Sequence, residues 1–265
     1  GSGKTFSALL LAKGMVDDWT KIAVIDTENA SADLYSHLGK YNTLTLTAPF
    51  SPERYIEAIK TCEQAGMEAV IIDSITHEWD GKGGCLEIHS QMTGNSYTNW
   101  AAVTPRHQNF IDAILQCKCH IITTVRRKQD YEMNKSDSGK TTVTKAGLKE
   151  VTREGWEYEL TVNFEFVNDK HLVRASKDRT QMFSGQPEFI ITSETGRQIL
   201  EWCQSGKDAS LELAQELQDA IDEIASCDNE ECLKLKWSGN KKFQKEPKFI
   251  EAKDKKKSEL SKVTA

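Results

Sequence analysis

The feature that most constrains the fold is the opening run Gly1-Ser2-Gly3-Lys4-Thr5, which leads directly into an apolar stretch of Ala and Leu. A Gly-Lys-Thr sequence that opens a helix is typical of the closing half of a phosphate-binding loop. In such a loop successive backbone N–H groups bind the anion, Lys4 reaches the β- and γ-phosphates, and the Thr5 hydroxyl holds Mg²⁺. The alternative is a glycine-containing helix start without a ligand, because short runs of this kind also occur by chance.

The loop pattern is incomplete at its beginning. The pattern G-x-x-x-x-G-K-[ST] ends on Gly3, Lys4 and Thr5, so its first glycine and the strand that feeds the loop would lie upstream of residue 1. The chain also begins with Gly and not with Met. We therefore expect the natural sequence to start earlier, and we expect the chain without that strand to have a gap in the middle of its sheet and to be unstable.

The composition is that of an ordinary soluble protein, with 38% hydrophobic and 28% charged residues in 265. This length is enough for one large α/β domain with an appendage or for two small domains. No apolar run is long enough to span a bilayer, so no membrane partner is expected. The seven cysteines lack C-x-x-C spacing, which favours reduced thiols of a cytoplasmic protein over a disulfide framework or a zinc site.

The net charge of −6 conceals two basic segments. Residues 234–265 carry eleven lysines against four acidic residues, and residues 126–153 carry eight basic against four acidic residues. These are the places where a polyanion could bind to a chain that is acidic as a whole.

Helices and strands alternate along the first part of the chain. Short apolar runs with β-branched residues predict buried strands at 21–26, 69–73 and 120–125. Between them, helical spacing predicts helices at 51–66 and 99–116, and a polar, glycine-rich loop is expected at 81–95. Strands separated by helices imply right-handed crossovers, so we predict an α/β fold with a doubly wound, mainly parallel sheet.

The pattern changes after Gly155. Three segments predict strands in hairpin or meander connection, which would form an antiparallel extension of the sheet, at 159–167, 171–176 and 188–192.

The sequence predicts three parts in all. The core would occupy residues 1–205 and end with a helix. An amphipathic helix with an acidic face would follow at 206–232, and a lysine-rich tail at 233–265, which we expect to be disordered because it has few apolar residues.

Two carboxylates stand where predicted strands end. Asp73 follows the run Val70-Ile71-Ile72, as does a Mg²⁺-organising carboxylate at the carboxyl edge of a parallel sheet, although it could instead cap the next turn. Glu28 follows the strand at 21–26 and could polarise an attacking water across the γ-phosphate from Lys4. Its alternative is an exposed acidic loop residue.

Together these segments resemble the RecA recombinase family. The residues that carry the likeness are Gly-Lys-Thr at 3–5, Ile25-Asp26-Thr27-Glu28, the strand that ends in Asp73-Ser74, and Lys177-Asp178-Arg179. The run from Gly1 to about Ser205 is closer still to small phage-encoded RecA-like P-loop ATPases of the AAA type, some of which act in recombination or single-strand annealing. Further likeness lies in His77-Glu78-Trp79 and in the segment 153–159.

The resemblance implies a site for ATP and Mg²⁺. Gly1, Ser2, Gly3, Lys4 and Thr5 would bind the nucleotide, with Thr5 and Asp73 at the metal and Glu28 as the catalytic glutamate. Lys177 and Arg179 match the basic pair that enters the ATP site of the neighbouring subunit in RecA filaments. This implies a homo-oligomer with ATP at subunit interfaces, and a cation delivered in trans to the developing charge. A solvated charged turn is the alternative for these two residues.

The resemblance also implies contact with single-stranded DNA. Thr124 and Arg126 stand where RecA proteins carry a γ-phosphate sensor and then a DNA-binding loop, although that sensor is usually Gln. The stretch from Arg127 to Lys149 could supply phosphate contacts and a stacking aromatic, or it could be only solvated. Its candidate residues are Arg127, Lys128, Tyr131, Lys135, Lys140 and Lys145.

These observations lead to one expected function and two alternatives. We expect an ATP-hydrolysing RecA-like phage protein that acts on single-stranded DNA in the cytoplasm of a bacterial host, together with phage recombination proteins. One alternative is a nucleotide-gated binding module with negligible hydrolysis. The other is a packaging or helicase-like motor, which the short chain disfavours.

Overall fold

The computed structural model of the protein describes residues 3–135, 141–167, 170–206 and 209–263. The chain divides into two compact units, Gly1–Gln204 and Ser205–Ala265, which are described separately. Within the described ranges, the helices are all too short or too polar to cross a membrane.

The first unit is built on a four-stranded parallel sheet with the order β2-β1-β3-β4. Its strands are β1 (Ile22–Asp26), β2 (Asn42–Thr45), β3 (Ala69–Asp73) and β4 (His120–Thr123). Every residue of β1 and β3 is buried, since both faces of these strands are covered, and each strand is apolar up to its final aspartate. The register pairs Asp26 with Asp73, so the two central strands end at the same edge. The predicted parallel sheet is confirmed.

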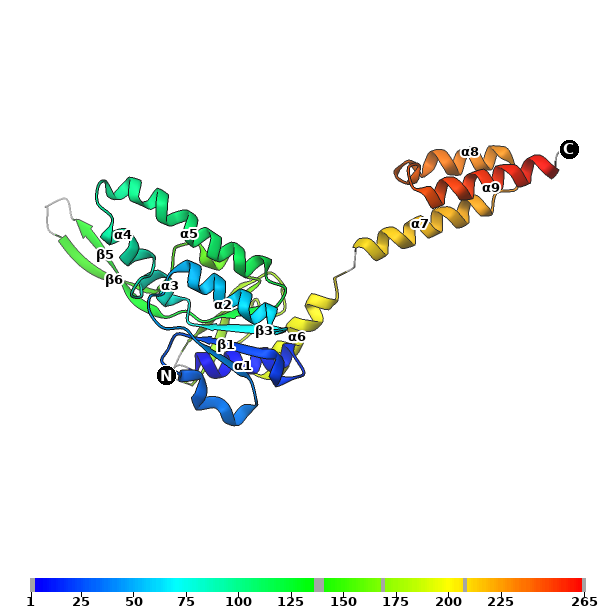
Figure 1. Ribbon diagram of the computed structural model, residues 1–265. Coiled ribbons are helices and arrows are strands. Elements are labelled where there is room, and N and C mark those ends of the chain that lie inside the picture. The colour runs from blue at the N-terminus through cyan, green and yellow to red at the C-terminus, as the bar shows by residue number, and fades with distance from the viewer. Residues whose placement is uncertain (1–2, 136–140, 168–169, 207–208, 264–265) are drawn as a thin grey trace. The chain divides into compact units, whose positions relative to one another are not determined.

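Helices cover both faces of this sheet (Figure 1). On one face, α2 (Pro52–Gln64) and α5 (Ser96–Gln116) pack Tyr55 and Phe110 against Ile25 and Ile72. On the other face, Leu9 of α1 (Lys4–Met15) packs against Val24 and Ile71. Adjacent residues of one strand thus enter opposite cores, as the alternation of side chains along a strand requires.

The antiparallel extension forms a separate three-stranded sheet. Its order is β7-β8-β9, with β7 (Val162–Phe166), β8 (Leu172–Asp178) and β9 (Phe189–Ile190). The closing helix α6 (Ser193–Gln204) packs against α1. Short 3₁₀ turns complete the unit: η1 (Trp19–Lys21), η2 (Ser31–Leu38) and η3 (Trp156–Tyr158).

Two segments differ from the sequence prediction. The stretch expected to be a loop at 81–95 contains the helix α4 (Cys85–Gln91), which follows α3 (Thr76–Asp80). The sequence did not predict this helix because its composition is largely polar. Cys85 is the one residue of α4 that is fully buried, so no apolar stripe marks the helix. The stretch expected to be a mobile loop after β4 is a two-stranded antiparallel hairpin of β5 (Arg127–Lys135) and β6 (Thr141–Glu150).

A cavity of about 580 Å³ lies beside β4, at the edge of the four-stranded sheet. Its walls come from α1, β4 and β7 and include Leu11, Ile122 and Phe164. The strand that the sequence predicts before Gly3 stays a prediction.

The second unit is a small helical domain, contrary to the expectation of a disordered tail. It contains α7 (Ala209–Ala225), α8 (Glu230–Gly239), η4 (Lys241–Phe243) and α9 (Pro247–Val263). Ile224, Leu233, Phe243 and Phe249 form its buried core. Lysine also contacts an aromatic ring of this unit, since Lys253 Nζ lies 4.9 Å from the centre of the Trp237 ring, within cation–π range.

Candidate functional site

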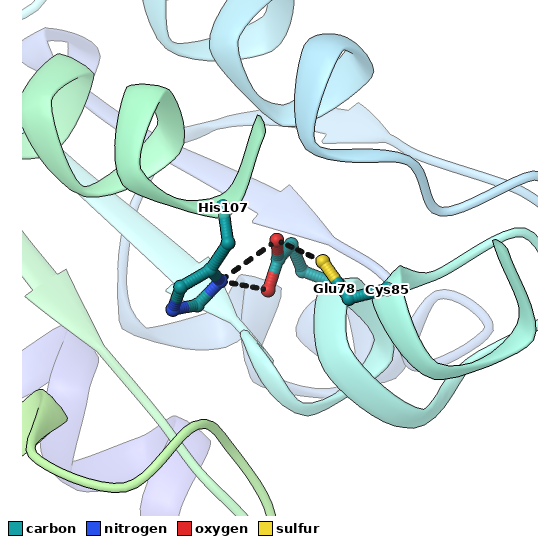
Figure 2. A group of neighbouring side chains, drawn as sticks. All are labelled: Glu78, Cys85 and His107. Atoms are coloured by element: carbon teal, nitrogen blue, oxygen red, sulfur yellow. Dashed lines mark hydrogen bonds and ion pairs between the residues drawn. The ribbon is translucent and has the colours of Figure 1, made fainter. Parts of the chain in front are cut away.

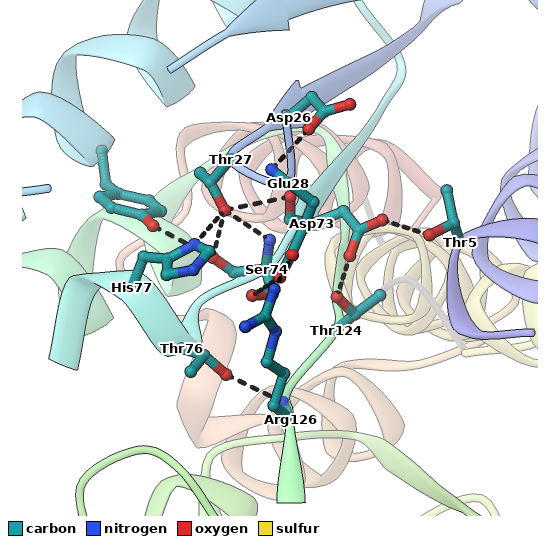
Figure 3. A network of polar contacts seen from close by, with 11 residues as sticks. Thr5, Asp26, Thr27, Glu28, Asp73, Ser74, Thr76, His77, Thr124 and Arg126 are labelled. Carbon is teal, nitrogen blue, oxygen red and sulfur yellow. Dashed lines mark hydrogen bonds and ion pairs between the residues drawn. The ribbon is translucent and has the colours of Figure 1, made fainter. Parts of the chain in front are cut away.

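The polar residues that follow the parallel strands gather at the carboxyl edge of the sheet (Figure 3). Asp26, Asp73 and Thr124 end or follow β1, β3 and β4, and all three are buried. In an open α/β sheet this edge is where ligands bind. The N-terminus of α1 reaches the same place, since Thr5 contacts Asp73.

The N-terminus of α1 begins after a glycine in a left-handed conformation. Gly3 caps the helix with φ of 87°, a left-handed conformation that glycine adopts without strain. A Cβ atom at Gly3 would also lie 2.7 Å from Nδ1 of His171. Lys4 is half-buried and begins the helix. Gly1 and Ser2, the other predicted nucleotide-binding residues, lie outside the described residues.

Asp73 is held by two hydroxyl groups. Thr5 Oγ1 donates to Asp73 Oδ2 over 2.5 Å, and Thr124 Oγ1 donates to Asp73 Oδ1 over 2.5 Å. Asp73 is only 2% exposed, so both of its oxygens need such donors. A hydroxyl and a carboxylate from two adjoining elements are the hard oxygen ligands that Mg²⁺ prefers, so Thr5 and Asp73 fit the predicted metal site. Thr124 lies beside them as a donor to Asp73.

Glu28 lies at the same edge, with its side chain 18% exposed. Its backbone N–H donates to Asp26 Oδ1 over 2.6 Å, which fixes the turn after β1. Ser74 Oγ donates to Glu28 Oε1 over 2.8 Å, and Arg126 forms an ion pair with Glu28 Oε2. The predicted base and the predicted sensor residue Arg126 are therefore in direct contact.

A second network behind Glu28 was missed by sequence reasoning. Thr27 Oγ1 accepts a hydrogen bond from Ser74 N–H over 2.9 Å and lies 2.8 Å from Nδ1 of His77. Burial lowers the pKa of His77, which favours the neutral imidazole. The peptide bond between Asp73 and Ser74 is cis. The network ties the ends of β1 and β3 to α3. Thr27, Ser74 and His77 each stand in a segment on which the family resemblance rests, but nothing in the sequence indicates that they contact one another.

Lys177 and Arg179 lie together at the end of β8 and bind another turn of the same chain. Lys177 Nζ donates to the carbonyl of Glu157 over 2.7 Å, and Arg179 Nη2 donates to the carbonyl of Tyr158 over 2.6 Å. Partial desolvation, and then the neighbouring charge of Arg179, lower the pKa of Lys177. The contacts described for this pair do not reach Glu28 or Asp73, so their predicted role in a neighbouring subunit stays a prediction.

Five of the six predicted DNA-binding residues lie in β5 and β6. Arg127 is engaged within the chain, with Nη2 3.4 Å from Oε1 of Glu165. Lys128 is exposed. Tyr131, Lys135 and Lys145 lie in β5 and β6, where only the backbone is described, and Lys140 lies outside the described residues.

A buried cluster of Glu78, Cys85 and His107 connects α3, α4 and α5 (Figure 2). Their possible ligand atoms lie within 4.8 Å of one another, a set that could hold a metal ion. In the structure these side chains are hydrogen-bonded to one another. His107 Nδ1 lies 3.0 Å from both oxygens of Glu78, and Cys85 Sγ donates to Glu78 Oε1 over 3.1 Å. Burial and the nearby Glu78 raise the pKa of Cys85, which keeps the thiol protonated. The spacing 78–85–107 has no metal-motif pattern, so the sequence could not predict this cluster.

Comparison with known proteins identifies the family of the chain. A family model described as an AAA domain matches residues 1–189. No curated protein and no solved structure matches the chain. The matched range includes the loop at Gly3, the strand-end carboxylates and the residues Lys177 and Arg179. With a parallel sheet, a Gly-Lys-Thr helix start and Asp73 in contact with Thr5, the chain belongs to the AAA domain family of nucleotide-binding proteins.

Proposed function

We propose that the protein is a RecA-like ATPase that binds ATP with Mg²⁺ at the edge of its parallel sheet and acts on single-stranded DNA in phage recombination or strand annealing. The observation that carries the catalytic part is the meeting of Thr5, Asp73 and Glu28 at one edge. A phosphate-loop hydroxyl, a buried strand-end carboxylate and a second, partly exposed carboxylate are the groups that hydrolysis of a nucleoside triphosphate needs.

Each group has one task in this proposal. Lys4 and the N-terminus of α1 bind the β- and γ-phosphates, because backbone N–H groups and an ammonium group favour anions there. Thr5 and Asp73 would hold Mg²⁺, which offsets phosphate charge when it is bound. Glu28 accepts the proton of the attacking water as the new P–O bond forms and ADP leaves.

Assembly and DNA contact belong to the same proposal. Lys177 and Arg179 would approach the phosphates of a neighbouring subunit in a homo-oligomer, which would make hydrolysis depend on assembly. Lys128, which is exposed near the start of β5, would contact nucleic-acid phosphate.

A nucleotide-gated binding module with negligible hydrolysis is a second candidate. It is favoured because Ser74 and Arg126 each contact one of the two carboxylate oxygens of Glu28. A glutamate whose side chain is fixed by these two donors is not free to reorient toward an attacking water, so the protein could bind ATP without turnover.

The experiment that separates the two candidates is Glu28→Gln. Steady-state ATP hydrolysis is measured with and without single-stranded DNA, and ATP binding is measured separately. Loss of turnover by about 10²–10⁴-fold, with ATP binding retained, is expected for a general base. Glu57→Gln, at an exposed glutamate of α2, is the matched control and should behave as wild type. Wild-type protein that binds ATP without turnover in either condition would contradict the catalytic proposal and leave the binding module.

A further inference from the structure

We propose that Glu78, Cys85 and His107 form a binding site for Zn²⁺ inside the first unit, separate from the predicted Mg²⁺ site. The ion would join three helices, because the three side chains come from α3, α4 and α5 (Figure 2). The inference goes beyond the proposed function, since it concerns a second metal with a structural role and does not depend on ATP turnover.

The donor atoms select the metal. A thiol, an imidazole and a carboxylate are the side chains that bind Zn²⁺ in proteins, whereas Mg²⁺ and Ca²⁺ take oxygen ligands. Tetrahedral Zn²⁺ holds such ligand atoms about 3.3–3.7 Å apart, given its usual bond lengths. His107 Nδ1 and Cys85 Sγ lie 3.0 Å and 3.1 Å from Glu78 Oε1, and the three ligand atoms lie within 4.8 Å of one another. Shifts of about 1 Å would therefore admit the ion, and Glu78 Oε2 or a water can complete four ligands.

The buried charge of Glu78 is the second observation. Its side chain is 1% exposed, and that of His107 is 2% exposed. A carboxylate in such a place needs a positive charge or several donors close to it. The hydrogen bonds described for this carboxylate come from an imidazole and a thiol, and neither group carries a permanent positive charge. A divalent cation would supply that charge, and the thiol and any Nδ1 proton would pass to solvent as the metal bonds form.

The chain between Glu78 and Cys85 turns tightly enough to bring these two residues together. The turn contains Gly83, whose φ is 77°, and Gly84. A Cβ at Gly84 would lie 2.7 Å from the carbonyl oxygen of Glu78. Glycine is the residue that tolerates both the left-handed backbone and this close approach, so the local sequence favours the meeting of the first two ligands.

The cluster is also what α3 and α4 contribute to the protein interior. The buried residues of α3 are Thr76 and Glu78, and that of α4 is Cys85. Trp79 packs edge-on against His107 with ring centres 5.3 Å apart, which limits rotation of the imidazole. Two short helices that bury so little apolar surface gain little from the hydrophobic effect, so a metal bond to each of them would stabilise this region.

Metal content gives the first test. The full chain is produced in medium with added Zn²⁺, purified with a reductant but without a chelator, and analysed by mass spectrometry of the elements. We expect about one Zn²⁺ per chain, as for a closed structural site. At free Zn²⁺ about 100 times its Kd, the unfolding equilibrium constant of the metal-free chain should fall about 100-fold.

Replacement of Zn²⁺ by Co²⁺ shows which atoms bind. A Co²⁺–thiolate charge-transfer band and the visible bands of tetrahedral Co²⁺ are expected, and added Zn²⁺ should remove both. Cys85→Ser should lose the thiolate band. Cys85→Ser and His107→Gln should each weaken Zn²⁺ binding by more than the about 10- to 100-fold that loss of an outer-shell partner costs.

Three variants serve as controls and should bind Zn²⁺ as wild type does. Cys62→Ser changes another buried cysteine of the same unit, and Cys203→Ser removes an exposed thiol. Thr5→Val lies at the predicted Mg²⁺ site, so an effect there would separate the two proposals. If Cys85→Ser does not fold, a thiolate band that persists in Cys203→Ser supports the proposal, and its absence from Cys203→Ser contradicts it.

Two results would overturn the Zn²⁺ site. One is a full chain that takes up neither Zn²⁺ nor Co²⁺. The other is metal that Cys85→Ser and His107→Gln retain and Cys203→Ser loses, which would be adventitious binding at an exposed thiol only. Because every measurement is made without nucleotide, failure of the ATPase proposal would leave the outcome unaffected.

Discussion

At the scale of single residues, the site depends on carboxylates whose oxygens each accept a hydrogen bond or form an ion pair with a neighbouring group. Asp73 has a threonine hydroxyl on each oxygen, one from α1 and one from the end of β4. A carboxylate that is 2% exposed loses most of its hydration, so each missing donor has a cost in stability. Thr124, which the sequence marked as a doubtful sensor, has a definite structural partner in Asp73.

We expect Thr124→Val to destabilise the protein by about 1–3 kcal/mol, because it leaves one oxygen of a buried carboxylate without a donor while the side-chain shape is kept. The measurement is the urea midpoint of the nucleotide-free protein. Thr123→Val, at the preceding and less buried position of β4, is the control and should cost less. Equal stability of Thr124→Val and wild type would show that the hydrogen bond to Asp73 contributes nothing.

At the scale of elements, the helix that begins at the predicted phosphate loop is supported by the close crossing of α1 and α6. Gly14 and Gly196 make this approach possible. A Cβ at Gly14 would lie 1.9 Å from the carbonyl oxygen of Ser193, and a Cβ at Gly196 would lie 2.1 Å from that of Leu11. Backbone atoms cannot yield as a flexible side chain would, so only glycine fits at these two positions.

We expect Gly196→Ala to cost about 1–3 kcal/mol or more, because the added methyl group forces α6 away from α1. Since α1 carries Lys4 and Thr5, affinity for Mg·ATP should also fall. Thermal unfolding and nucleotide titration measure the two effects. Gly239→Ala, where nothing lies within 4 Å of the new Cβ, should leave both unchanged. An unaltered melting temperature for Gly196→Ala would mean that the helices can separate without loss.

At the scale of the whole molecule, the sequence predicted what depends on local pattern and missed what depends on tertiary contact. The short apolar run at 69–73 predicted a buried strand. Runs of this kind, separated by helices, led to the parallel sheet that the structure confirms. The contact of Arg126 with Glu28 joins residues 98 positions apart, and no local rule relates them. The helical fold within 233–263 was not predicted because its core residues, such as Phe243 and Phe249, are scattered among lysines.

The two units should unfold as separate cooperative transitions, because each has its own core. Phe249 is fully buried in the core of the second unit, so Phe249→Ala should destabilise that unit by about 3–5 kcal/mol and leave the first unit unchanged. Calorimetry of the full chain would show one transition moving to lower temperature. Mg·ATP should raise only the other transition, because a ligand stabilises the unit that binds it.

Leu235→Ala is the control for this experiment, since Leu235 is an apolar residue of the same unit but is 71% exposed. Its loss removes little buried surface, so both transitions should stay where they are. If Phe249→Ala instead lowered both transitions together, the two cores would be energetically coupled. The helical unit would then contribute to the stability of the nucleotide site, and its removal would weaken ATP binding.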